Sequence, residues 1–184
     1  MRLVHWQPSS RDDAVALCTA GMALAFVVGD LDNGAALIDR ALSLNPNLAM
    51  AWLFSGWVKV WRGEPEAAID HLAHATRLNP HDPQIANAQA ATANALFFVD
   101  RYAEALSLVD LALLDKPNHY VAACVAAASG ALGGRLEEAR QIMVRLRELD
   151  PTLRISNLSQ LIPFRRPEDL AKFAQGLRAA GLLE

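Results

Sequence analysis

Two markers recur along this chain of 184 residues with one common spacing. One marker is a proline that ends an apolar helical pattern, and the other is a turn sequence upstream of each proline. The prolines are Pro46, Pro80, Pro117 and Pro151, and the turns begin at Gly29, Gly63, Asp100 and Gly134. Successive prolines lie 34, 37 and 34 residues apart, and so do successive turns. Because a proline cannot continue a helix, each unit reads as two helices joined by a turn. The chain therefore predicts four helical hairpins.

The second unit shows the physical reasons for the pattern most clearly. We expect Gly56 and Ala68 to be small because the two helices of the hairpin approach each other closely there. Trp52 should fill the space beside them and anchor the unit. Gly63 should end the first helix with a positive φ angle, which is cheap only for glycine.

A 34-residue unit with this pattern of small residues, turn and final proline resembles the tetratricopeptide repeat. The resemblance covers about residues 13–151, and Met22 stands where the first unit should have a small residue. The matching positions include Trp52, Gly56, Gly63, Ala68, Ala75, Pro80, Ala105, Ala112, Pro117, Gly134, Ala139 and Pro151. The implied repeats span about 13–47, 48–82, 83–118 and 119–151. The resemblance implies an all-α, right-handed α-α superhelix that binds other proteins or peptides.

The two ends of the chain lie outside the repeats. We expect residues 1–12 to be loosely ordered and residues 152–184 to form capping helices. The segment from Thr152 to Phe164 reads as a short amphipathic helix, and Pro167 begins another. An open solenoid needs such a terminal element with a polar outer side.

Composition excludes several classes of partner. The net charge of −3 and the pI of about 5.9 argue against nucleic-acid binding. The apolar stretch 14–29 is shorter than the roughly 20 residues that span a bilayer and lacks a basic flank, so it reads as the first repeat helix rather than a membrane or signal segment. Cys18 and Cys124 lie far apart in the sequence, which favours reduced thiols in the cytoplasm.

The closing string FAQGLRAAGLLE, residues 173–184, carries a narrower resemblance. It is similar to the end of bacterial tetratricopeptide regions that follow a class III nucleotide cyclase domain or a winged-helix DNA-binding domain. Leu183 stands where those strings usually have proline. This resemblance implies the regulatory region of a larger bacterial signalling protein, attached to an effector domain.

The sequence offers little catalytic chemistry. His71 and His74 share a helix face and His81 follows, but a solvated convex face explains them better than a metal site. The glycine-rich stretch 130–135 lacks the ending of a phosphate loop and falls on a repeat turn. Cys124 reads as a buried or groove-lining thiol. We therefore predict no enzyme activity, no cofactor and no metal.

The repeat register instead predicts a concave groove lined by aromatic and aliphatic side chains. The candidate groove residues are Phe26, Met50, Leu53, Trp57, Val60, Trp61, Asn87, Asn94, Phe97, Phe98 and Cys124. None is Lys or Arg, which argues against a clamp for a peptide carboxylate. Either an apolar or amphipathic partner segment docks there, with Asn87 and Asn94 bonding its backbone, or tight curvature and the capping helix bury the strip.

Three functions remain open at this point. The first is a protein-interaction scaffold that regulates an attached or separate effector. The second is a self-associating module in which the groove or the cap forms a homodimer interface. The third is a small-molecule sensor with its site inside the superhelix.

Overall fold

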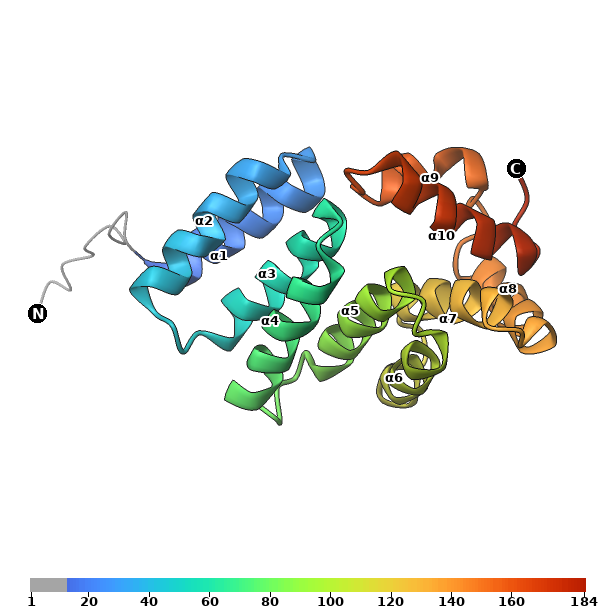
Figure 1. The fold of residues 1–184 in the computed structure, drawn as a ribbon, viewed down its shortest axis with the longest axis horizontal. Helices are drawn as coiled ribbons and strands as arrows, with labels where there is room; N and C mark the ends of the chain where they lie inside the picture. Colours follow the sequence, from blue (N-terminus) through green and yellow to red (C-terminus); the bar gives the residue numbers. More distant parts are fainter. Residues whose placement is uncertain (1–12) are drawn as a thin grey trace, which may run out of the picture.

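The computed structural model describes residues 13–184, which form a right-handed, all-α superhelix of four helical hairpins followed by a C-terminal segment (Figure 1). The segment 1–12, for which we expect loose order, lies outside the described residues. The first helices of the hairpins are α1 Ala14–Ala23 with its π-helical extension η1 Leu24–Val28, α3 Ala49–Arg62, α5 Ile85–Phe98 and α7 Tyr120–Leu132. The second helices are α2 Leu31–Leu44, α4 Pro65–Leu78, α6 Tyr102–Asp115 and α8 Leu136–Leu149.

The first helices form the inner layer of the superhelix. Contacts join α1 to α3, α3 to α5 and α5 to α7, and α2, α4 and α6 also contact the first helix of the next hairpin. Helices α5 and α7 are therefore enclosed by neighbours, and most of their residues are buried. Their alanine-rich sequences suit this position, because alanine favours the helix and allows close packing on every side.

Each hairpin turn contains one residue in the left-handed backbone region. The φ angles are +79° at Gly29, +77° at Gly63, +61° at Asp100 and +84° at Gly134. Asp100 is the only residue other than glycine with a positive φ among residues 13–184. Asp and Asn tolerate this conformation better than other side chains, so the third hairpin keeps the same turn without glycine.

The second hairpin shows why a helix crossing needs a small residue. A Cβ atom added to Gly56 would lie 2.5 Å from Cγ of Leu72 on α4, which is closer than side chains can approach. Ala68 lies one helical turn before Leu72 on α4 and is fully buried. The close approach of α3 and α4 therefore depends on these small residues.

The first hairpin departs from the expected register by one residue. The small residue at its crossing is Gly21, where an added Cβ would lie 2.6 Å from the carbonyl oxygen of Gly34. The expected position, Met22, is half-buried instead. Gly21 precedes the turn at Gly29 by eight residues, whereas Gly56 precedes Gly63 by seven. The π-helix η1 absorbs this extra residue.

Trp52 is half-buried rather than enclosed in the core of its hairpin. Its Nε1 donates to the carbonyl oxygen of Pro46 at 2.8 Å, and its ring contacts His71 and His74 with centroids 4.8 and 4.4 Å away. His71 is therefore not on a fully solvated face as expected. Its Nδ1 lies 2.9 Å from Oγ of Ser55, and burial lowers the pKa of His71.

The helix expected from Thr152 to Phe164 is shorter in the structure. A 3₁₀ turn, η2 Ile155–Asn157, leads into the single-turn helix α9 Leu158–Leu161. The chain is then extended at Ile162, with φ −131° and ψ 121°. Pro163 explains this ending, because the residue before a proline avoids the helical region. The last helix, α10 Pro167–Ala179, begins at the predicted proline.

The C-terminal segment turns back toward the first hairpin instead of only covering the last one. In Figure 1 the connection between α9 and α10 points toward the blue first hairpin. Helix α10 packs on α7, and a Cβ added to Gly176 would lie 2.9 Å from Cβ of Ala128 and 3.0 Å from its backbone. The ring of Phe173 meets that of Phe97 on α5 at 5.5 Å. Residues 152–184 therefore occupy part of the concave side.

Candidate functional site

The concave side holds two adjoining hollows. The inner cavity has a volume of about 320 Å³ and is lined by Met22, Phe26, Trp57, Trp61, Asn87, Asn94, Tyr120, Val121, Cys124, Leu153, Leu158, Leu161, Ile162 and Phe173. The outer cleft has a volume of about 390 Å³ and is lined by Phe26, Val27, Val28, Gly29, Leu31, Ser159, Gln160, Leu161, Ile162, Pro163, Phe164, Arg165 and Leu170. Three residues, Phe26, Leu161 and Ile162, belong to both walls, so the outer cleft leads to the inner cavity.

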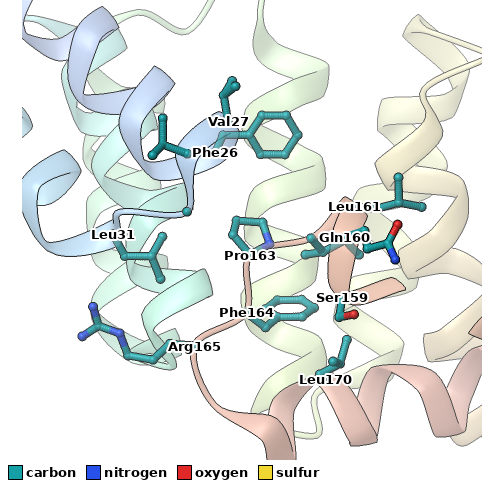
Figure 2. A pocket seen from close by; sticks show the side chains of 13 residues that line it. Phe26, Val27, Leu31, Ser159, Gln160, Leu161, Pro163, Phe164, Arg165 and Leu170 are labelled. Atoms are coloured by element: carbon teal, nitrogen blue, oxygen red, sulfur yellow. The ribbon is translucent and has the colours of Figure 1, made fainter. Parts of the chain in front are cut away.

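The outer cleft lies between the π-helix and turn of the first hairpin on one side and the extended part of the C-terminal segment on the other. Figure 2 shows Phe26 and Val27 on one side of the cleft and Pro163 and Phe164 on the other. The side chains of the π-helix are well exposed, at 51% for Phe26, 78% for Val27 and 69% for Val28. A run of three exposed apolar residues at the rim of a cleft is typical of a binding surface.

Polar contacts hold the far wall of the cleft in place. The backbone N–H of Arg165 donates to the carbonyl oxygen of Trp61 at 2.8 Å, and its guanidinium lies 2.8 Å from the carboxylate of Asp32. Nζ of Lys172 on α10 lies 2.8 Å from the carboxylate of Asp100 and donates to the carbonyl oxygen of Phe98 at 3.1 Å. The C-terminal segment is thus tied to the first three hairpins.

Aromatic rings form much of the wall of the inner cavity. Trp61 is stacked between Phe26 and Trp57, with centroid separations of 5.5 and 5.6 Å. Nε1 of Trp57 donates to Oδ1 of Asn87 at 3.2 Å, which fixes the indole. The ring of Phe173 closes another side of the cavity from α10. The cavity therefore lies between the repeat helices and the C-terminal segment.

The buried thiol in the cavity wall is not a nucleophile. Burial raises the pKa of Cys124 to about 12, so the thiol is protonated at neutral pH. The imidazole of His119 accepts the backbone N–H of Ala122 at 3.3 Å and thereby caps α7. These two side chains have separate structural roles.

The other candidate chemistry has a structural explanation as well. The stretch 130–135 forms the end of α7 and its turn, with Gly134 in the left-handed region. No group of three His, Cys, Asp or Glu side chains within residues 13–184 could hold a metal ion. Over the same residues, no helix has the length and apolar character to cross a membrane.

The structure brings together only part of the groove predicted from the sequence. The predicted residues that line the inner cavity are Phe26, Trp57, Trp61, Asn87, Asn94 and Cys124. Leu53, Val60 and Phe97 are buried between helices and line neither hollow, so we no longer assign them to the groove. Met50 and Phe98 are half-buried and also line neither hollow. The ring of Phe98 packs against Phe164 instead.

Sequence analysis left open that the capping helix buries the apolar strip, but it did not name the residues of the C-terminal segment that line the cavity. Leu153, Leu158, Leu161, Ile162 and Phe173 all face the inner cavity. Their apolar spacing could be read from the sequence, but it did not decide whether these side chains or a partner segment would cover the concave side. Met22 was missed because the first hairpin was read one residue out of register.

Four helical hairpins, each with a left-handed turn residue and close helix crossings, define a superhelical repeat protein with the tetratricopeptide-repeat fold. The structure is similar to that of YrrB, described as a tetratricopeptide protein with an unusual peptide-binding site, with 22% identity and a TM-score of 0.60 over 93% of this chain and 86% of YrrB. It is also similar to PilW, a type IV pilus biogenesis factor, with 17% identity and a TM-score of 0.71 over 93% of this chain and 74% of PilW.

A third similar structure is TTC0263 of Thermus thermophilus, described as a thermophilic tetratricopeptide protein. It has 18% identity and a TM-score of 0.66, and the match covers 91% of each chain. No protein-family model matches this chain, and no curated protein sequence matches it. At these identities the likeness establishes the fold.

Proposed function

We propose that this chain is a protein-interaction scaffold, without catalytic activity of its own, that binds an apolar or amphipathic segment of a partner protein in the outer cleft. The observation that carries the proposal is the exposed apolar rim formed by Phe26, Val27 and Val28 beside the cleft. Covering exposed apolar surface of this kind with a partner removes it from water and lowers the free energy of the complex.

The chemistry of the cleft indicates what the partner segment looks like. Most of its lining residues are apolar, but polar groups, among them those of Ser159, Gln160 and Arg165 on the C-terminal side, make up the larger part of its accessible surface. A segment with two or three apolar anchors on one face and polar side chains on the other matches this distribution. The peptide-binding site of YrrB, a protein of the same fold, is consistent with such a role.

We also propose that the scaffold acts as a regulatory region in the cytoplasm of a bacterium, with the partner either attached to it or separate. The support for this context is the resemblance of residues 173–184 to bacterial tetratricopeptide regions that follow effector domains. Gly176 and Gly181 of that string have clear structural roles, since one packs on α7 and the other ends α10 with a φ of +104°. We therefore propose that the two glycines of this string dock and end the last helix in the same way in those bacterial regions.

Selection from a random peptide library on phage tests the proposal. The immobilised wild-type chain should enrich peptides with apolar anchors, and Val27→Glu should lose them because a charge then stands on the rim. Leu114→Glu is the matched control, since Leu114 is 81% exposed on α6, away from the cleft. Enriched peptides that bind Val27→Glu as well as wild type would refute the site.

Light scattering distinguishes the alternative occupant, a second copy of the chain. A monomer at working concentration agrees with the proposal. A dimer that Val27→Glu dissociates and Leu114→Glu does not would show that the rim serves self-association instead. Both measurements use folded protein, which circular dichroism verifies for each variant.

A further inference from the structure

The two hollows of the concave side differ in chemistry. Apolar groups make up most of the accessible surface of the inner cavity, and none of the fourteen described residues that line it is Asp, Glu, Lys, Arg or His. Polar groups make up the larger part of the accessible surface of the outer cleft. An apolar side chain therefore suits the inner cavity, whereas the peptide groups of a bound segment suit the outer cleft.

The polar side chains of the inner cavity are engaged or enclosed within the protein. Nε1 of Trp57 donates to Oδ1 of Asn87 at 3.2 Å, and the hydroxyl of Tyr120 donates to the carboxylate of Asp150 at 3.1 Å. Asn94 is only 2% exposed, and its Oδ1 is enclosed by protein. A charged occupant would lose its hydration without gaining a counter-charge, so the cavity selects an uncharged, apolar occupant.

The inner cavity has room for an aromatic side chain. Apolar cavities of about 150 Å³ hold benzene, and this cavity of about 320 Å³ is roughly twice as large. Aromatic rings from α3 and α10 lie in its wall and favour contact with a further ring. The wall shared by both hollows, at Phe26, Leu161 and Ile162, lets a side chain enter from a backbone that lies in the outer cleft.

We infer that the partner segment inserts one large aromatic side chain, that of Phe or Trp, into the inner cavity while its backbone lies in the outer cleft. This inference rests on the proposed function and assigns the specificity of that interaction. The aromatic anchor touches α3, α5, α7 and the C-terminal segment together, so its binding also holds that segment against the repeats. An aromatic anchor enclosed in a pocket commonly carries much of the affinity of an interface.

Calorimetric titration with two peptides tests the inference. One is a peptide enriched by the phage selection, and the other is the same peptide with its aromatic residue replaced by alanine. Wild type should bind the alanine peptide about tenfold more weakly or worse, because the anchor is lost. Val121 lines the inner cavity and not the outer cleft, so Val121→Phe fills the anchor site and should weaken binding of the aromatic peptide about tenfold. The same variant should bind the alanine peptide within about twofold of wild type, because that peptide leaves the cavity empty.

A second filling variant guards against a folding defect in the first. Leu161 is 40% exposed and lies in the wall common to both hollows, so Leu161→Trp narrows the passage without crowding the core. It should also weaken binding of the aromatic peptide more than that of the alanine peptide. Leu114→Phe on the surface of α6 is the matched control and should leave both affinities unchanged.

The outcomes separate this inference from the proposed function. The inference alone is overturned if the enriched peptides lose binding in Val27→Glu but bind Val121→Phe and Leu161→Trp as tightly as wild type. It is also overturned if the enriched peptides contain neither Phe nor Trp. A wild-type chain that enriches no peptide overturns both. A wild-type dimer that Val121→Phe dissociates would show that the cavity receives a side chain of a second copy, which again overturns the inference.

Discussion

Phe173 is the side chain on which the docking of the C-terminal segment should depend most. It is 1% exposed, and its ring makes edge-to-face contacts with Phe97 and Phe164 at 5.5 and 5.7 Å. Truncating a buried Phe to Ala costs about 3–5 kcal/mol. Because Phe173 already lines the inner cavity, the new void joins an existing one, and we expect Phe173→Ala to cost about 3 kcal/mol, at the lower end of that range. Phe173→Leu, which loses the two ring pairs but keeps most of the volume, should cost about 1–1.5 kcal/mol.

The assay is urea unfolding followed by two signals. Circular dichroism reports the helices of the whole chain, while the fluorescence of Trp57 and Trp61, isolated by replacing Trp6 and Trp52 with Phe in both proteins, reports the cavity beside α10. The two curves should coincide in wild type, and in Phe173→Ala the fluorescence change should come at lower urea, because each part of a solenoid depends mainly on its neighbours. Coincident curves with a loss below about 1 kcal/mol would show that Phe173 does not hold the segment in place.

Three further perturbations have defined outcomes. Trp52→Ala should cost about 2–3 kcal/mol in urea unfolding, less than for an enclosed Trp, and Trp52→Phe about 1 kcal/mol for its lost hydrogen bond. Asp100→Asn should lower the free energy of unfolding by only about 0.5 kcal/mol, because it removes the ion pair with Lys172. Asp100→Ala should lower it by about 1–2 kcal/mol more, because alanine tolerates the left-handed backbone less well. Equal losses for the two variants would contradict this. Burial lowers the pKa of His71 and His119, so the unfolded chain takes up protons first as the pH falls, and stability should decrease below about pH 6.5. In His71→Gln the urea midpoint should change less between about pH 7.5 and pH 5 than in wild type. The same pH dependence in both proteins would refute this.

Local rules made the repeat architecture predictable. A turn residue with positive φ and a proline after each second helix depend on neighbouring residues alone, so Gly63 and Pro80 indicate their roles directly. Asp100 could be placed as well, because the spacing of the other turns required a left-handed residue there. The tightness of the Gly56 crossing follows from the same register.

The features that depend on tertiary structure were not predictable in this way. The first hairpin has one extra residue, which the π-helix accommodates. Counting seven residues back from Gly29, as in the second hairpin, therefore placed Met22 at the helix crossing instead of Gly21. The C-terminal segment has no repeat to give it a register, so the meeting of Phe173 with Phe97 depends on a distant contact. As a result, the sequence indicated an apolar strip but left open whether a partner segment or the capping helix covers it.

The bond between Arg165 and the first two hairpins has a consequence for how this protein can evolve. Solenoids commonly gain or lose whole units, because each unit contacts only its neighbours. Here the backbone of Arg165 bonds to Trp61, and its side chain pairs with Asp32, across the span of the intervening hairpins. One hairpin more or fewer would place these partners too far from Arg165. The length of the connection between α9 and α10 therefore fixes the number of hairpins in this chain.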